Sequence, residues 1–443
     1  MLDTEAALAR ALERAGLQPA GSGAAVTAAA RAGAFDIAEL GRGAASAGNP
    51  VPALVQALTA LVPPAAAGAV HLGATSQDII DTALMLVARD VLARLEQQLA
   101  SAASAAAALA TAHVRTVMVG RTLLQQAVPV TFGLVAAGWL TAIDDARRQL
   151  DRVRARRLAV QFGGAAGTLS VLGADGPRVA ALLADELGLS VPVLPWHTDR
   201  LRVIELAAAL AGACAAAGKI GRDVTLLAQT EVGEVRAGAG GSSAMPHKRN
   251  PVAAVLAVGC ARRAPMLLAT VAAAAEQELQ RAAGGWHAEW EPVAELLRLT
   301  SSAAAWTAEL LAGLEVDADR MRANLAAAGE LPMAEQIATR LMPALGRLPA
   351  LALVAKASRE AAARGQALTA VLTGLPQFAG PLAAAGVSAA ELAAAAEPEA
   401  GLGAAASFTA AALAAHDEHE LAAAGHQPAG GHEPHATSRQ VSR

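Results

Sequence analysis

A short segment near the middle of the chain combines residue types that could stabilise a negative charge and move a proton. Residues 238–251 read Gly-Ala-Gly-Gly-Ser-Ser-Ala-Met-Pro-His-Lys-Arg-Asn-Pro. Glycines give backbone freedom and exposed N–H groups that can cradle an oxyanion. A serine hydroxyl is a candidate nucleophile or base. Lysine and asparagine side chains can hold a carboxylate whose charge grows in a transition state.

We therefore interpret this segment as a mobile catalytic loop. A Gly/Ser-rich surface connection is the plain alternative, but the prolines at 246 and 251 restrain its far side. A phosphate-binding loop is disfavoured, because the GxxxxGK[ST] spacing is missing and the preceding segment looks helical. The candidate residues are Ser242 as the reactive group, Lys248 and Asn250 as carboxylate ligands, and Gly238, Gly240, Gly241, Ser243 and Met245 as the mobile frame.

The loop resembles the signature loop of the fumarase/aspartase superfamily, and two further segments support this resemblance. Residues 71–78 (His-Leu-Gly-Ala-Thr-Ser-Gln-Asp) and 120–127 (Gly-Arg-Thr-Leu-Leu-Gln-Gln-Ala) are similar to its other two active-site regions, in the same order. The resemblance runs from about Met1 to Glu418. Residues 77–82, 163–168, 195–198 and 286–291 most resemble the branch that cycloisomerises 3-carboxy-cis,cis-muconate.

The resemblance implies a role for each candidate. Ser242 corresponds to the proton-transfer residue, which loop closure would activate. The family stabilises an aci-carboxylate intermediate and needs no cofactor and no metal. The substrate would be a small tricarboxylate, and the residues expected to bind it are His71, Thr75, Ser76, Gln77, Arg121, Gln125, His197, Lys248 and Asn250.

Plainer roles exist for several of these residues. Hydroxyls at a helix start, as at Thr75 and Ser76, are most often caps, although the same helix N-terminus can bind an anion. Asp78 is expected to support that helix start. Arg121 and Gln125 are expected one helical turn apart, facing the site together, and a salt bridge at the edge of the core is the alternative for Arg121.

Leu123 distinguishes between branches of the superfamily. Fumarase-like and adenylosuccinate-lyase-like members have a histidine at this position that assists the leaving group, whereas the muconate cycloisomerases have an apolar residue. In the reverse cycloisomerase reaction the leaving group is a carboxylate, which needs no proton. We expect Leu123 to occupy an apolar packing site. Asp199, where the family usually has glutamine, is a departure from the pattern.

Composition indicates a mostly helical protein. The chain has 443 residues, 54% of them hydrophobic but only 2% aromatic, and its abundant alanine is the strongest helix former. The net charge of −4 and pI near 6.2 give no basic surface for nucleic acid. Two cysteines in apolar stretches and an N-terminus without a signal-peptide pattern predict a cytoplasmic protein. The uncharged stretch 122–143 is interpreted as a bundle helix rather than a membrane span.

The predicted fold class is all-α, with three helical domains around a long five-helix bundle. Long apolar segments cover roughly 77–115, 125–158, 199–236, 250–280 and 286–325. Their sparse charges predict burial against other chains, and the resemblance implies a homotetramer with shared active sites. The expected divisions are 1–75 (an N-terminal helical domain, short relative to the family), 76–331, 332–421 and a disordered tail, 422–443. Histidines at 416, 419, 426, 432 and 435 are interpreted as part of a solvated tail rather than a metal site.

These patterns lead to one preferred function and two alternatives. The preferred function is lactonisation of 3-carboxy-cis,cis-muconate in protocatechuate degradation, with proton transfer through an aci-carboxylate. One alternative is a superfamily lyase that releases fumarate, such as one acting on adenylosuccinate. The other is a non-catalytic structural homologue, against which the intact Ser242, Lys248 and Asn250 argue.

Overall fold

The computed structural model describes residues 1–238, 245 and 248–425. These residues group into two compact units: unit 1 comprises Met1–Ala105 and Asp145–Asp317, and unit 2 comprises Ala106–Asp144 and Ala318 onward. The described residues are mostly helical, which confirms the all-α prediction. Two helices contribute to both units: α5 (Ser76–Ala112) and α6 (Phe132–Arg156). The domain divisions near residues 75, 331 and 421 remain predictions.

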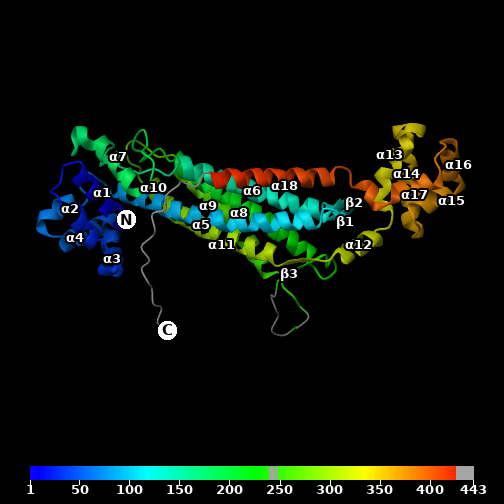
Figure 1. Ribbon diagram of the computed structural model, residues 1–443, viewed down its shortest axis with the longest axis horizontal. Helices are drawn as coiled ribbons and strands as arrows, with labels where there is room; N and C mark the ends of the chain where they lie inside the picture. The colour runs from blue at the N-terminus through cyan, green and yellow to red at the C-terminus, as the bar shows by residue number, and fades with distance from the viewer. Residues whose placement is uncertain (239–244, 246–247, 426–443) are drawn as a thin grey trace. The chain divides into compact units, whose positions relative to one another are not determined.

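Unit 1 contains the longest uninterrupted apolar helices. In Figure 1, α8 (Leu201–Leu227), α9 (Val252–Ala274) and α11 (Trp290–Ala312) lie side by side and pack against one another. Small residues let the first two approach closely: a Cβ on Gly218 would lie 2.4 Å from the Ala261 Cβ, and one on Gly221 would lie 2.7 Å from the Ala254 carbonyl oxygen. Alanine therefore serves both helix propensity and close packing.

The first helix of the chain packs against a helix from much later in the sequence. In unit 1, α1 (Leu2–Arg14) and α7 (Gly176–Leu187) share one apolar core, and Arg10 Nε donates to Glu186 Oε2 at 2.6 Å. The other elements here are α2 (Ser22–Ala29), η1 (Ala32–Ala34), α3 (Ile37–Ala47), α4 (Val51–Leu61), η2 (Pro64–Ala69), η3 (Gly173–Asp175) and α10 (Gly285–Ala288).

A β-hairpin replaces the start of one predicted helix. In unit 2, β1 (Val117–Thr122) pairs antiparallel with β2 (Gln125–Thr131), whereas the sequence pattern predicted a helix from about residue 125. That prediction is wrong for residues 125–131. Pro129 disfavours a helix interior, and Val128, Val130 and Thr131 favour a strand. Leu123 and Leu124 form the two-residue turn with φ of 51° and 64°.

A short strand also precedes the predicted catalytic loop. α8 ends at Leu227, and β3 (Val235–Ala237) pairs antiparallel with β4 (Leu314–Val316). The predicted helix 199–236 is therefore too long by its last residues, and the segment before the loop is a strand rather than a helix. The missing GxxxxGK[ST] spacing is the argument that still disfavours a phosphate-binding loop. After the loop, Pro251 precedes the first residue of α9.

The C-terminal part of unit 2 is helical. The elements are α12 (Ala318–Ala327), η4 (Leu331–Met333), α13 (Ala334–Leu345), α14 (Arg347–Arg364), α15 (Leu368–Gly374), α16 (Pro376–Ala384), α17 (Ala389–Ala396), η5 (Pro398–Gly401) and α18 (Ala405–Gly425). The elements from η4 to α17 enclose one apolar core that includes Ile337, Leu368 and Phe378. Because α18 reaches Gly425, residues 422–425 of the predicted tail are helical. Residues 426–443 lie outside the described part of the chain.

Two described helices, α8 and α9, are long and apolar enough to cross a membrane by length and composition alone. In α8, 50% of the apolar window is buried within the chain, but in α9 the figure is only 17%. The stretch 122–143, considered at first as a possible span, is divided between β2 and α6. The α11 helix that packs against both carries Glu295 and Arg298, so we interpret α8 and α9 as bundle helices.

Candidate active site

The Asp78 carboxylate, 1% exposed, joins three separate segments of unit 1. It accepts hydrogen bonds from the backbone N–H groups of Thr75 (3.0 Å), Gly163 (3.1 Å) and Gly164 (2.9 Å). Its Oδ1 atom also lies 2.7 Å from His197 Nε2. Because a carboxylate only accepts, the His197 proton in this bond is on Nε2. Asp78 supports the start of α5, as the sequence predicted, and also fixes the His197 ring. We call these five residues the Asp78 centre.

Glycine is required at both positions that face this carboxylate. A Cβ on Gly163 would lie 2.6 Å from Pro195 Cβ and 2.9 Å from His197 Cε1. Gly164 has a φ of +66°, and a Cβ there would lie 2.9 Å from a backbone oxygen. Two consecutive N–H groups can reach Asp78 only because neither residue has a side chain.

Gln77, predicted to bind substrate, is 1% exposed. Its Nε2 donates to the His197 carbonyl oxygen at 2.8 Å and to Asp81 Oδ2 at 3.2 Å. Among the described residues, Gln77 Oε1 is buried without a hydrogen-bond partner. The amide nitrogen of Gln77 therefore holds two other segments of the protein in place. The amide oxygen is the atom left to accept a hydrogen bond from another donor.

A buried ion network adjoins the Asp78 centre. Arg200 donates to Asp81 through Nη1 (2.8 Å) and Nη2 (3.1 Å), and to Glu289 through Nε (3.2 Å) and Nη2. Trp286 Nε1 donates to Asp81 Oδ1 at 3.0 Å. All four residues are at least 97% buried, so loss of Arg200 would leave two buried carboxyl groups without their cation.

The pKa values of two groups in this network are raised, for different reasons. Burial disfavours the cation at Arg200, but the carboxylates of Asp81 and Glu289 outweigh burial and raise the pKa of its guanidinium. Burial raises the pKa of the Glu289 carboxyl to about 7, with a further contribution from Asp81 and an opposing one from Arg200. Glu289 is thus the group in the network that titrates near neutral pH.

Thr75 and Arg281 form a half-buried edge of this part of unit 1. Arg281 Nη1 donates to Thr75 Oγ1 at 2.8 Å, and its guanidinium lies 5.8 Å from the Trp286 ring centroid. Burial lowers the pKa of the Arg281 guanidinium, while Asp78 and Asp81 oppose that shift. Thr75 and Ser76 are half-buried at the start of α5, where a hydroxyl, a helix N-terminus and a cation together suit a carboxylate.

His71 is held by a glutamate from the first helix. Its backbone N–H donates to Glu5 Oε2 at 3.0 Å, and its Nδ1 lies 2.7 Å from Glu5 Oε1. Glu5 is fully buried, and His71 has a φ of 59°. The residue is therefore locked in position by two hydrogen bonds to one side chain. Its other ring nitrogen, Nε2, is the one left for a ligand.

The predicted catalytic loop is only partly described. Gly240, Gly241, Ser242 and Ser243 lie outside the described residues. Gly238 directly follows β3, Met245 and Lys248 are exposed, and Asn250 is half-buried. The Lys248 N–H donates to the Met245 carbonyl oxygen at 2.9 Å. The loop thus leaves a strand and returns to a helix start.

Arg121 and Gln125 belong to the hairpin of unit 2, so the prediction that they lie one helical turn apart is wrong. In the strand register Arg121 pairs with Gln126, and Gln125 pairs with Thr122. Because side chains alternate along a strand, Arg121 and Gln125 point to opposite faces of the hairpin. Gln125 lines a cavity of about 620 Å³ with Leu331, Pro332 and Glu335, among others.

Leu123 and Asp199, the two positions that differ from other members of the superfamily, have distinct surroundings. Leu123, expected in an apolar packing site, is 97% exposed at the hairpin tip in the single chain, so that expectation is wrong for the isolated chain. Asp199 Oδ1 accepts a hydrogen bond from the Leu201 N–H at 3.2 Å. Asp199 therefore stabilises the first turn of α8.

Sequence reasoning missed Glu5, Arg200 and Arg281. Arg200 directly follows the segment 195–199, and that adjacency was an available signal. Arg281 lies in the short connection between α9 and α10, where a lone cation beside motif residues could have been noticed. Glu5 carried no signal, because its partner His71 is 66 residues away.

Comparisons with known proteins identify relatives that match most of this chain. Residues 2–265 match a lyase family model. The chain is 47% identical over 407 residues to 3-carboxy-cis,cis-muconate cycloisomerase of Bradyrhizobium diazoefficiens, covering 90% of this chain and 89% of that protein. It is 46% identical over 400 residues to nitrosuccinate lyase of Streptomyces davaonensis, with coverage of 87% and 84%. The crystal structure of the Pseudomonas putida 3-carboxy-cis,cis-muconate lactonizing enzyme superposes with a TM-score of 0.87 and 43% identity, covering 95% and 94%.

Proposed function

The chain belongs to the lyase family of fumarase/aspartase-fold enzymes, and we propose that it cycloisomerises 3-carboxy-cis,cis-muconate to a carboxymuconolactone. The observation that carries this proposal is the Asp78 centre, which draws residues 75–78, 163–164 and 197 together. Relatives that match most of the chain include cycloisomerases.

In the proposed reaction, one substrate carboxylate oxygen adds to the conjugated alkene and forms the lactone C–O bond. The alkene electrons move onto a second carboxylate and give an aci-carboxylate. Ser242 then donates a proton to the carbon and regains one from solvent. The carboxylate that gains charge is bound by Lys248 and Asn250, because donors aimed at developing charge lower the barrier.

The remaining carboxylates are bound at the start of α5. Thr75 and Ser76 offer hydroxyls and the helix N-terminus, and Arg281 offers a cation already hydrogen-bonded to Thr75. His71 and His197 present ring nitrogens in fixed orientations, each held by a buried carboxylate. Gln77 acts through His197, because its Nε2 donates to the His197 carbonyl oxygen.

We further propose that the enzyme is a homotetramer with active sites shared between chains. Two features of the single chain support this. The α9 helix leaves apolar side chains exposed, including Val255 (53%) and Met266 (68%). The hairpin tip exposes Leu123 (97%) and Leu124 (66%), so Arg121 and Gln125 would serve the site of another chain. Such surfaces are typical of interfaces.

A cytoplasmic location is proposed from the cysteines. Cys214 is buried in α8, Cys260 is half-buried in α9, and both are free thiols. Burial raises the pKa of both thiols, so they stay protonated and unreactive.

A lyase acting on a succinate derivative is the second candidate, favoured by the 46% identity to a nitrosuccinate lyase. Leu123 disfavours only those lyases whose amine leaving group needs a proton. A nitro group departing as nitrite needs none, so the apolar residue fits that elimination as well as lactonisation. Both reactions use the same aci-carboxylate.

Parallel assays on the purified enzyme separate the candidates. We expect loss of muconate absorbance with 3-carboxy-cis,cis-muconate and no fumarate from nitrosuccinate or adenylosuccinate. Ser242→Ala serves as the matched control for each substrate. Fumarate release from nitrosuccinate with a larger kcat/KM than lactonisation would assign the lyase function instead.

A further inference from the structure

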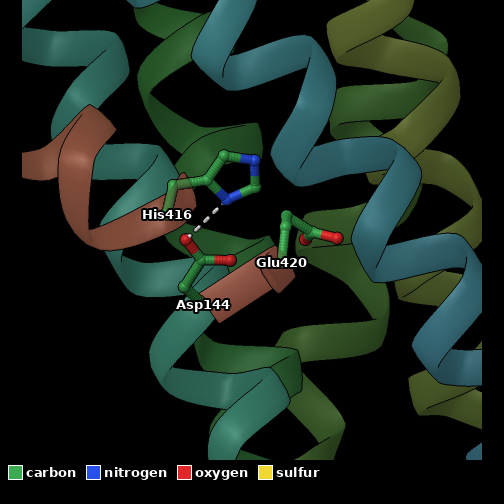
Figure 2. A group of neighbouring side chains, drawn as sticks. All are labelled: Asp144, His416 and Glu420. Atoms are coloured by element: carbon green, nitrogen blue, oxygen red, sulfur yellow. Dashed lines mark hydrogen bonds and ion pairs between the residues drawn. The ribbon is translucent and has the colours of Figure 1, made fainter. Parts of the chain in front are cut away.

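A second cluster of potential ligands lies in unit 2, apart from the residues of the Asp78 centre. Asp144 is on α6, and His416, His419 and Glu420 are on α18. Residues spaced by three and four positions share one face of a helix, so all three α18 residues face the same way. Figure 2 shows the Asp144 carboxylate opposite the His416 ring, with Glu420 one turn further along α18. We call these four residues the Asp144 cluster.

The cluster is compact and largely buried. His416 Nδ1 lies 3.0 Å from Asp144 Oδ2, and His419 Nδ1 lies 3.6 Å from Asp144 Oδ1. One ligand atom each from Asp144, His416 and Glu420 lie within 4.8 Å of one another. His416 is 7% exposed and Asp144 is 3% exposed. The expectation that His416 belongs to a solvated tail is therefore wrong, because it packs against α6.

His419 provides an independent observation. Its Nδ1 is buried, and among the described residues it has no hydrogen-bond partner. Buried polar atoms are nearly always paired, and an unpaired one needs an explanation such as an ion. Its side chain is 12% exposed and faces Asp144. The Nδ1 atom of His419 thus faces a carboxylate that already meets a second imidazole.

We infer that the Asp144 cluster binds a divalent transition-metal ion, with Zn²⁺ as the first candidate. Imidazole nitrogen with carboxylate oxygen is a donor set that suits zinc, and its sites usually take four ligands. The metal would replace the direct hydrogen bond between Asp144 and His416. Metal–ligand bonds of about 2.0–2.2 Å place the ligand atoms of a tetrahedral site about 3.4 Å apart. The ligand atoms of Asp144, His416 and Glu420 lie within 4.8 Å of one another, so the Glu420 carboxylate would move toward the other two when the metal binds. It is the solvent-accessible member of the cluster.

Such a metal would fasten α18 to α6 within unit 2. Binding a ligand to the folded state alone raises the free energy of unfolding by RT ln(1 + L/Kd), where L is the free ligand concentration. The effect is therefore expected in thermal stability and metal content. It is independent of the proposed reaction, so either proposal can fail without the other.

The decisive experiment measures Zn²⁺ bound by the full chain in equilibrium dialysis. Histidines 426, 432 and 435 would compete, so the background carries His426→Ala, His432→Ala and His435→Ala. In this background we expect about one Zn²⁺ per chain and a Zn²⁺-dependent rise in Tm. Co²⁺ in place of Zn²⁺ should give the absorption bands of nitrogen and oxygen coordination.

Two glutamates of the same helix provide the matched test. Glu420→Gln should weaken Zn²⁺ binding at least about tenfold and remove the rise in Tm. Glu418→Gln, the same change at an exposed position, should leave both within about twofold. His416→Asn should also weaken Zn²⁺ binding. If the His416→Asn variant fails to fold, the comparison of Glu420→Gln with Glu418→Gln still tests the proposal. Binding that disappears with the tail histidines, or that Glu420→Gln leaves unchanged, would overturn the proposal.

Discussion

Asp78 in unit 1 and Asp144 in unit 2 are both buried aspartates beside a histidine nitrogen, at 2.7 and 3.0 Å. Asp78 also accepts from three backbone N–H groups contributed by two segments. Asp144 instead meets a second histidine, His419, whose Nδ1 is unsatisfied among the described residues. The Asp78 carboxylate is surrounded by backbone donors, so its role is to hold the fold together. The Asp144 carboxylate is next to two imidazoles, which are groups that can bind a metal ion together with it.

The largest expected effect comes from removing the Asp78 carboxylate. Asp78→Ala would leave three backbone N–H groups and His197 Nε2 without their acceptor, so we expect about 3–5 kcal/mol lower free energy of unfolding. Asp144→Ala, measured without metal, should cost about 1–2 kcal/mol. Urea denaturation of both variants tests the comparison, and equal losses would contradict it.

Next in size is the effect of Ser242→Ala, which distinguishes a loss of catalysis from a loss of stability. We expect kcat to fall at least about a hundredfold, the usual contribution of a proton-transfer group, with an unchanged urea midpoint. Asp78→Asn should instead lower both activity and stability, because Asp78 acts by holding His197. Near-normal turnover in Ser242→Ala would remove the serine from the mechanism.

A smaller effect concerns Glu289, whose pKa is raised to about 7 by burial. The folded state then binds a proton that the unfolded state releases between about pH 4.5 and 7. The stabilisation is therefore present at low pH and is lost as pH rises toward 7, by up to about 1.4 kcal/mol per pH unit. Unfolding free energies of wild type and Glu289→Gln across this range should converge or cross as pH rises. Parallel curves would exclude the shift.

The smallest overall effect is expected at the hairpin tip. Leu123 is 97% exposed in the single chain, so Leu123→His should change the unfolding free energy of the dissociated chain by no more than about 0.5 kcal/mol. Lactonisation should not improve, because a departing carboxylate needs no general acid. Kinetics and urea denaturation of the same preparation measure both quantities. Faster lactonisation by Leu123→His would contradict the view that the departing carboxylate needs no general acid.

The sequence predicted local features well where one short segment carries the signal. The all-α class follows from alanine content and apolar spacing, and Asp78 was assigned to its helix start from position alone. Residues 125–131 were predicted as helix because their lack of charge matched the following helix. Their Val, Thr and Pro residues instead form β2, where pairing with β1 outweighs continuation of the helix.

Residue types and motif order were determined by the sequence alone: a loop with Ser242, Lys248 and Asn250, three family segments, and Leu123 in place of histidine. Only the tertiary structure decided which distant groups meet. Thr75 and Arg281 are 206 residues apart, and Asp144 and His416 are 272 apart. Propensity and capping act within a few residues, whereas such contacts depend on how whole helices pack. The partners of the Asp78 centre and the Asp144 cluster are therefore properties of the fold.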